Sequence, residues 1–164
     1  MPRLSGVECY LLKLPQEGTL ISMTEELCIR KARLDDGGFV FATKKQAFRE
    51  YVEHVWGWDE SRQRELHNTR FAKHDFRIIR IRGIDVGFFA TSNTSEALRL
   101  HQLFILPEYQ GRGIGSACMT RIVNRANIAK KPVMLQVLKI NARAAAFYQR
   151  IGFDVAGTIS ATST

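Results

Sequence analysis

Three glycines at alternating positions, Gly111, Gly113 and Gly115, follow an apolar stretch that ends at Pro107, and a predicted helix begins among them. Glycine adopts backbone conformations that are closed to other residues, and it lets a ligand approach the main chain. At the start of a helix, unpaired N–H groups and the positive end of the dipole converge, which favours phosphate binding. Arg112 adds a guanidinium fork suited to phosphate oxygens. The stretch therefore predicts a phosphate-binding loop; the alternative is a tight strand-to-helix connection.

Spacing excludes two common phosphate motifs. The glycines follow Gly-x-Gly-x-Gly, not the Gly-x-Gly-x-x-Gly of dinucleotide-binding proteins, and no Gly-Lys-Ser/Thr of a nucleoside triphosphate loop follows. Residues 110–115, Gln-Gly-Arg-Gly-Ile-Gly, resemble instead the Gln/Arg-x-x-Gly-x-Gly/Ala signature of the GNAT superfamily of N-acetyltransferases. In that family the loop cradles the pyrophosphate of acetyl-coenzyme A. The resemblance therefore implies cofactor binding by Gln110, Gly111, Arg112, Gly113, Ile114, Gly115 and Ser116.

A second segment, residues 141–153, resembles the family pattern Asn-x-x-Ala-x-x-Phe-Tyr-x-x-x-Gly-Phe, and it follows the loop in the family's order. The resemblance implies that Tyr148 is catalytic and protonates the departing thiolate. The alternative is a core tyrosine whose hydroxyl has a hydrogen-bond partner. Asn141 is expected to orient the pantetheine arm, to cap the helix, or both. Ala144 is expected to line the cofactor site.

The apolar strand before the loop contributes backbone groups. In the family this strand splays away from the next one, so the resemblance implies that Phe104, Ile105 and Leu106 pair with the pantetheine through their free main-chain groups. The N–H of Ile105 is our candidate for polarising the acetyl carbonyl, as in an oxyanion hole. The alternative is an ordinary central strand in which every backbone group is paired.

A general base is also expected, because an ammonium acceptor must lose a proton before it attacks. The candidates are Asp59, Glu60, Glu96 and His101. Glu60 is selected as catalytic because residues 56–60, Trp-Gly-Trp-Asp-Glu, lie between the first two predicted helices, where the family places its acceptor. Aromatic faces combined with carboxylates suit a cationic amine. The alternative is that Glu60 belongs to a helix start beside an apolar turn.

The elements that position these residues are expected in the order β-α-α-β-β-β-α-β-α-β. Helical spacing of Phe41, Phe48, Val52 and Val55 indicates one apolar helix face. The resemblance to the GNAT fold from residue 27 to about 159 implies an α/β domain with a mixed, mostly antiparallel sheet flanked by helices and a shortened C-terminal strand. The predicted strands are 27–32, 76–82, 86–91, 98–106, 133–138 and 153–159, and the predicted helices are about 35–55, 59–73, 114–129 and 141–151.

The chain of 164 residues is expected to form one domain. Residues 1–26 are interpreted as an N-terminal extension and 27–164 as a single N-acetyltransferase domain. Met23 resembles a natural start, so residues 1–22 are expected to come from an upstream start codon. Three scattered cysteines exclude a disulfide framework and a zinc site, and no metal site is predicted. Cys118 occupies an apolar helical position and is expected to be a buried thiol.

Composition favours a cytoplasmic protein without membrane association. No apolar run approaches the roughly 18 residues that span a bilayer, and no signal peptide is visible. The net charge of +8 favours polyanionic partners, and coenzyme A is itself a polyanion. The basic residues are dispersed along the chain, so nucleic acid is not expected as a partner.

The leading hypothesis is an N-acetyltransferase that moves the acetyl group of acetyl-CoA directly to a primary amine of a small molecule or peptide. One alternative is a toxin-type relative that acetylates the amino acid on charged tRNA, which the net charge motivates. Another is a non-catalytic coenzyme A-binding module, which the short C-terminus motivates. A homodimer is compatible with each of them, because many members of the family dimerise.

Overall fold

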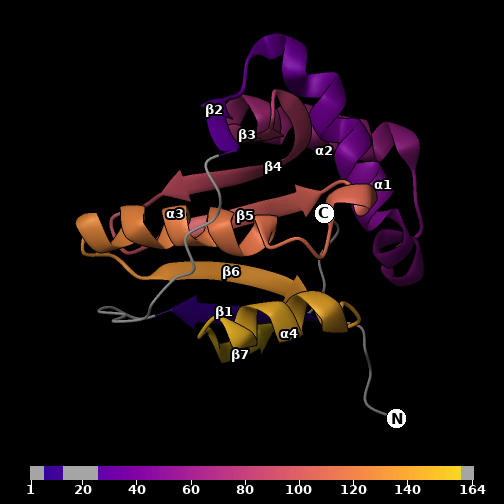
Figure 1. The fold of residues 1–164 in the computed structure, drawn as a ribbon. Helices are drawn as coiled ribbons and strands as arrows, with labels where there is room; N and C mark the ends of the chain where they lie inside the picture. The colour runs from indigo at the N-terminus through magenta and orange to yellow at the C-terminus, as the bar shows by residue number, and fades with distance from the viewer. Residues whose placement is uncertain (1–5, 13–25, 160–164) are drawn as a thin grey trace.

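The computed structural model describes residues 6–12 and 26–159. In this part of the chain seven strands form one sheet in the order β2-β3-β4-β5-β6-β1-β7 (Figure 1). The strands are β1 (Val7–Leu12), β2 (Leu27–Lys31), β3 (Asp75–Ile81), β4 (Ile84–Asn93), β5 (Leu98–Ile105), β6 (Val133–Leu138) and β7 (Asp154–Ile159). The helices are η1 (Leu34–Asp36), α1 (Gly37–Val55), α2 (Glu60–Lys73), η2 (Pro107–Tyr109), α3 (Ile114–Ile128) and α4 (Ala142–Arg150). The predicted α/β fold is confirmed.

The sheet is mostly antiparallel, and helices pack on both of its faces. Side chains alternate along a strand, so neighbouring residues face opposite sides. Ile79 of β3 belongs to the core beneath α3 and α4, whereas Ile78 packs with Val40 of α1 on the other face. Figure 1 shows α3 running alongside β5, with β6 below it in this view. Only β5 and β6 run parallel among the described strand pairs, which confirms the expected mixed sheet.

Strand β1 differs from the expected extension at residues 1–26. It lies between β6 and β7 and pairs antiparallel with both, from Val7 opposite Leu138 to Leu12 opposite Val133 on the β6 side. Val7, Tyr10 and Leu12 are buried, and Tyr10 is 1% exposed. This segment therefore belongs to the sheet, because its apolar side chains face the core and its backbone joins β7 to β6. Residues 1–5 and 13–25, with the expected start at Met23, lie outside the described residues.

The helices and strands begin and end near the predicted residues, but the turn between β3 and β4 is shorter than predicted. Asp59 caps α2 as predicted, accepting a hydrogen bond from the N–H of Arg62 at 3.1 Å. The turn between β3 and β4 contains only Arg82 and Gly83, both at positive φ, whereas the sequence suggested residues 83–85. Residues 84 and 85 instead extend β4, which is the usual arrangement of a two-residue hairpin. None of the helices in the described ranges combines the length and apolar character needed to cross a membrane.

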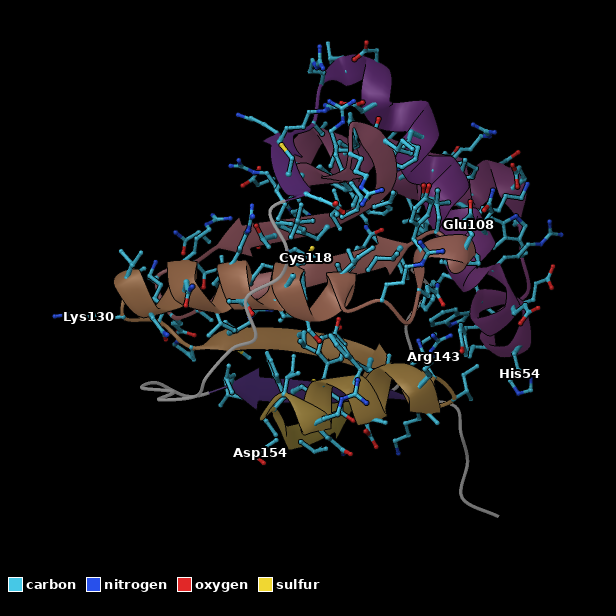
Figure 2. All side chains as sticks on the ribbon, viewed as in Figure 1. His54, Glu108, Cys118, Lys130, Arg143 and Asp154 are labelled. Atoms are coloured by element: carbon cyan, nitrogen blue, oxygen red, sulfur yellow. The ribbon has the colours of Figure 1, made fainter. Side chains whose placement is uncertain are left out.

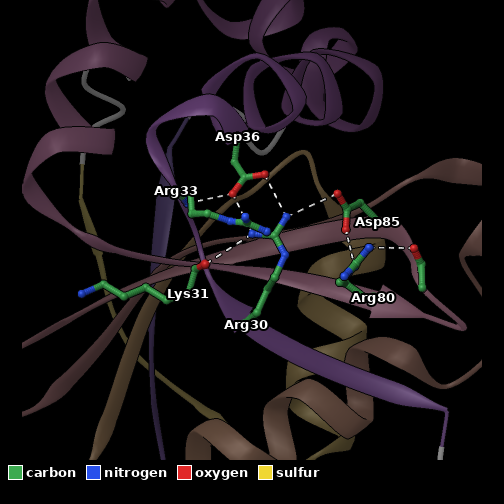
Figure 3. Close-up of polar contacts among 7 residues, drawn as sticks. Arg30, Lys31, Arg33, Asp36, Arg80 and Asp85 are labelled. Carbon is green, nitrogen blue, oxygen red and sulfur yellow. Dashed lines mark hydrogen bonds and ion pairs between the residues drawn. The ribbon is translucent and has the colours of Figure 1, made fainter.

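An ion-pair cluster ties β2 and η1 to the β3–β4 hairpin (Figure 3). Asp36 accepts two hydrogen bonds from the guanidinium of Arg30, at 2.7 and 2.9 Å, and a third from the N–H of Arg33 at 2.7 Å. Arg30 also lies 3.5 Å from Asp85, which pairs with Arg80 at 2.8 Å. The Arg30 hydrogen bonds are the main reason that the pKa of Asp36 is lowered to about 2.

Replacing Asp36 by asparagine is expected to lower the free energy of unfolding at pH 7 by on the order of 1–2 kcal/mol. This value is smaller than the pKa shift alone implies, because solvent near Arg30 screens the ion pair. Because the folded pKa of about 2 lies below the ordinary value of 3.8, the carboxylate stabilises the fold above about pH 4. That contribution disappears as the pH falls towards 2. Urea unfolding of both proteins across this range measures the effect. Asp35→Asn, an exposed neighbour, is the control; an equal loss there contradicts the assignment.

Candidate active site

Strands β5 and β6 separate to form a fork. Their parallel pairing runs from Leu98 opposite Val133 to Leu100 opposite Leu135 and then stops, although both strands continue. His101 is the extra residue of a β-bulge at this point, because Leu100 pairs with Thr91 and Gln102 with Ala90. A bulge bends its strand and redirects side chains. The predicted splaying of this strand is therefore present, and the bulge marks its apex.

The backbone of Ile105 faces the open side of the fork. The N–H of Leu106 donates to the carbonyl of Val86 at 2.8 Å, so this pair is bonded across β4 and β5. Bonded and non-bonded pairs alternate in an antiparallel ladder. The next pair, Ile105 with Gly87, is therefore non-bonded, and the N–H of Ile105 points away from β4. With β6 no longer paired there, this N–H is a free donor within the described part of the chain.

The glycine loop leads into the N-terminus of α3. Gly111 has φ 74° and Gly113, the N-cap of α3, has φ 82°, and a side chain at either position would enter open space. No side chain caps this helix, so the N–H groups of its first turn are available to a ligand. The open space and the uncapped helix end fit an anionic group such as a pyrophosphate.

Polar contacts hold the loop against β5 and α4. The amide of Gln110 donates from Nε2 to the carbonyl of Ile105 at 2.9 Å and accepts at Oε1 from Arg143 at 2.9 Å. Figure 2 shows Arg143 at the end of α4 that faces the loop. Gln110 therefore positions the loop. Arg143 was not among the predicted site residues, although it is basic and lies two residues after the motif position Asn141. Arg112 instead lies over the ring of Tyr109, 5.3 Å from its centre.

Close packing explains the third glycine. A β-carbon at Gly115 would lie 3.4 Å from the ring of Phe147 and 3.7 Å from Ile105. A larger residue here would push α3 away from α4 and from β5. Gly115 therefore keeps the loop, the fork and the second motif segment together.

A groove of about 750 Å³ joins the fork, the loop and the first turns of α3 and α4. Most of the predicted site residues line it, whereas Leu106, Arg112 and Glu60 do not. The predicted residues in its lining are Phe104, Ile105, Gln110, Gly111, Gly113, Ile114, Gly115, Ser116, Asn141, Ala144 and Tyr148.

Tyr148 closes the inner end of this groove. It is 8% exposed, and its ring packs against Tyr10, Phe147 and Phe153. Burial raises the pKa of Tyr148, so the phenol keeps its proton at physiological pH. The hydroxyl forms no hydrogen bond with a described residue, which differs from the alternative of a tyrosine with a hydrogen-bonded hydroxyl. Asn141 caps α4 by accepting from the N–H of Ala144 at 3.1 Å.

A smaller inner cavity of about 150 Å³ continues past Tyr148, towards α1 and α2. Of the four base candidates only His101 lines it. Burial of its ring, then the neighbouring basic groups His74 and Arg70, lower the pKa of His101 to about 4. Its ring stacks on His74 with centres 3.9 Å apart, and Nε2 lies 2.7 Å from Oγ of Ser92. His101 is therefore neutral at physiological pH.

Glu60 lies elsewhere, at the start of α2. Its carboxylate accepts from Nε1 of Trp58 at 2.7 Å and from Lys45 at 3.1 Å, and these bonds lower its pKa. Neither the groove nor the inner cavity is lined by Glu60. A carboxylate already held by two donors is a weak base, so the structure places this residue among the contacts that join α1 to α2.

Comparison with known proteins gives consistent matches. The family model described as "Acetyltransferase (GNAT) domain" matches residues 70–155. An uncharacterized N-acetyltransferase from Archaeoglobus fulgidus is 27% identical over 126 residues, which cover 72% of this chain and 84% of that protein. Another from Methanocaldococcus jannaschii is 33% identical over 87 residues, 48% of this chain. The match spans only 38% of that second relative's length.

Solved structures share the fold. The crystal structure of a GNAT family acetyltransferase from Elizabethkingia anophelis with acetyl-CoA bound matches with a TM-score of 0.64. The match covers 82% of this chain and 80% of that chain, at 11% sequence identity. At this identity the likeness concerns the fold alone.

Proposed function

Because this chain belongs to the GNAT acetyltransferase family, we propose that it is an N-acetyltransferase that moves the acetyl group of acetyl-CoA directly to a primary amine. One observation carries the proposal. A single groove brings together the uncapped N-terminus of α3, the free N–H of Ile105 and the protonated phenol of Tyr148. These groups supply an anion site, an oxyanion donor and an acid, which acetyl transfer from a thioester requires.

The loop and α3 would hold acetyl-CoA at its pyrophosphate, through the N–H groups at residues 113–116. The open space at Gly111 and Gly113 supports this fit. The Elizabethkingia relative, whose structure contains acetyl-CoA, shares this fold. Beyond the loop, the edge of β5 that no longer pairs with β6 would lie beside the pantetheine, in the position of an added strand.

At the fork the chain's own groups would act on the thioester. The N–H of Ile105 donates to the acetyl carbonyl oxygen, where negative charge develops as the amine attacks. Tyr148 gives its proton to the departing sulfur, and the proton that the nitrogen loses as the amide forms restores the phenol. The inner cavity, on the far side of Tyr148, provides the approach for the amine.

Transfer without an acetylated cysteine fits the positions of the three thiols. Cys118 is buried in α3 (Figure 2), and burial raises the pKa of its thiol to about 12. A thiol that stays protonated is a poor nucleophile. Cys9 and Cys28 line neither the groove nor the inner cavity.

Gly113→Glu is expected to weaken acetyl-CoA binding by at least roughly tenfold, because it places an anion at the helix N-terminus that would receive the pyrophosphate. Calorimetric titration of acetyl-CoA into both proteins measures this change. Gly83→Glu is the matched control, since Gly83 has a similar φ of 78°, also faces open space and lies in the β3–β4 turn. Equal binding by wild type and Gly113→Glu, or no binding by wild type, argues against the proposal.

A further inference from the structure

The inner cavity is lined by two cationic side chains, and no described carboxylate lies there to neutralise them. Lys44 reaches it from α1 and Arg70 from α2, beside the neutral ring of His101 at the bulge of β5. None of its described lining residues is Asp or Glu; beside these three it is lined by apolar and amide side chains and by Tyr148. The cavity is smaller than the roughly 300 Å³ at which pockets for drug-sized ligands begin, so it suits a small group.

Lys44 is the more buried of the two cations. It is 4% exposed, and its ammonium forms no ion pair or hydrogen bond with any described residue. Burial, and then the charge of Arg70, lower the pKa of Lys44 to about 8, so it remains mostly protonated at pH 7. A buried charge without a partner is unfavourable. An anion placed against Lys44 would remove that penalty.

Arg70 reinforces this charge. It is partly buried, burial lowers its pKa, and among the described residues no carboxylate pairs with it. Three partly buried cations elsewhere in the chain have carboxylate partners: Arg30 with Asp36, Arg77 with Asp75, and Lys45 with Glu60. Lys44 and Arg70 therefore differ from these three cations, because no described carboxylate offsets their charge.

The position of the cavity connects this charge to the reaction. It shares Leu103, Phe104, Asn141, Ala144 and Tyr148 with the groove, so the two spaces meet at the fork. A ligand in the inner cavity would extend from the proposed acetyl position towards Lys44 and Arg70. Guanidinium and ammonium groups together bind carboxylate and phosphate oxygens strongly.

We propose that the acceptor is an amine that also carries an anionic oxygen group, a carboxylate or a phosphate, which Lys44 and Arg70 bind while the amine lies near Tyr148. The inference rests on the proposed function, since it names the acceptor of that reaction. It excludes purely cationic polyamines as preferred acceptors.

Binding of matched probe pairs tests the proposal. To test for a carboxylate, the binding of a pool of amino acids that includes β-alanine is compared with the binding of the corresponding amides. To test for a phosphate, the binding of O-phosphoethanolamine is compared with that of ethanolamine. We expect the charged member of at least one pair to bind about tenfold more tightly in ligand-observed NMR titrations. The preferred pair identifies the anion as carboxylate or phosphate. Equal binding of both members of each pair, or no binding of any charged probe, overturns the proposal.

Variants locate the site. Lys44→Met and Arg70→Gln are each expected to abolish the preference for the charged probe, and thermal melting checks that both fold. Lys45→Met is the matched control, because its ammonium pairs with Glu60 outside the cavity. If Lys45→Met removes the preference as Lys44→Met does, the proposed site is wrong. These titrations use the protein without coenzyme A, so a failed acetyl-CoA titration contradicts the proposed function separately.

Discussion

Tyr148→Phe is expected to lower kcat by roughly 10²–10³-fold while leaving acetyl-CoA binding and stability almost unchanged. The substitution removes only the hydroxyl, which has no hydrogen-bond partner among the described residues, and the phenyl ring keeps its contacts with Tyr10, Phe147 and Phe153. The departing thiolate then has no acid beside it. Steady-state release of free coenzyme A, with a primary amine as acceptor, measures the loss.

Tyr10→Phe is the matched control for this experiment. Tyr10 is also buried, and the centre of its ring lies 6.5 Å from the centre of the Tyr148 ring. Its hydroxyl donates to Glu8 at 2.6 Å, and Tyr10 lines neither the groove nor the inner cavity. Its kcat should match that of wild type. An unchanged kcat in Tyr148→Phe would show that this phenol is not the acid, and the backbone donor at Ile105 would remain as the main catalytic group.

Deletion of residues 1–12 is expected to unfold the protein. The deletion removes β1, and with it the ladder to β6, the ladder to β7 and three buried apolar side chains. Burial of those side chains alone contributes on the order of 5 kcal/mol, which is comparable to the whole stability of a typical domain. Circular dichroism and urea unfolding of the truncated chain measure the result.

Single substitutions in β1 provide a graded version of this test. Tyr10→Ala should cost about 3–5 kcal/mol because it empties a fully buried position. Cys9→Ser, in the same strand, should cost little, since Cys9 is only half-buried and lies outside the core cluster. A truncated chain with the unfolding midpoint of wild type would return residues 7–12 to the role of a dispensable extension.

Local patterns predicted the elements from residue 27 onward. Helical spacing, the caps at Asp59 and Asn141 and the glycine loop each depend on a few neighbouring residues, and the structure contains all of them. The motif residues also predicted most of the groove. The bulge at His101 was not predictable in this way, because it depends on the register between β4 and β5.

The position of β1 in the sheet and the contacts of Glu60 depend on residues that the local sequence does not identify. Residues 9–12, Cys-Tyr-Leu-Leu, give an apolar strand signal, but nothing local indicates that the partners of this strand are β6 and β7. Glu60 drew attention because of the aromatic residues around it, yet Trp58 and Lys45 already bind its carboxylate. A pattern within a few residues indicates the type of an element, whereas its partners depend on the folded chain.

The burial of Lys44 could have been predicted from its position in the sequence. Lys44 lies three residues after Phe41 and four before Phe48, on the face of α1 that the apolar spacing predicts to be buried. A charged residue on such a face is either paired or functional. Arg70 carries no equivalent pattern, because α2 is polar over most of its surface.

The position of β1 has a consequence for synthesis on the ribosome. This strand leaves the ribosome before the other described strands, yet it must pair with the last two, since Leu12 lies opposite Val133 and Val7 opposite Ile159. Strands β3, β4 and β5 have neighbours close in the chain and can associate early, whereas closing the long loop between β1 and β6 is entropically unfavourable and slow. The nascent chain therefore carries an unpaired apolar strand until β6 and β7 have been made, and such a strand is prone to aggregation during that interval.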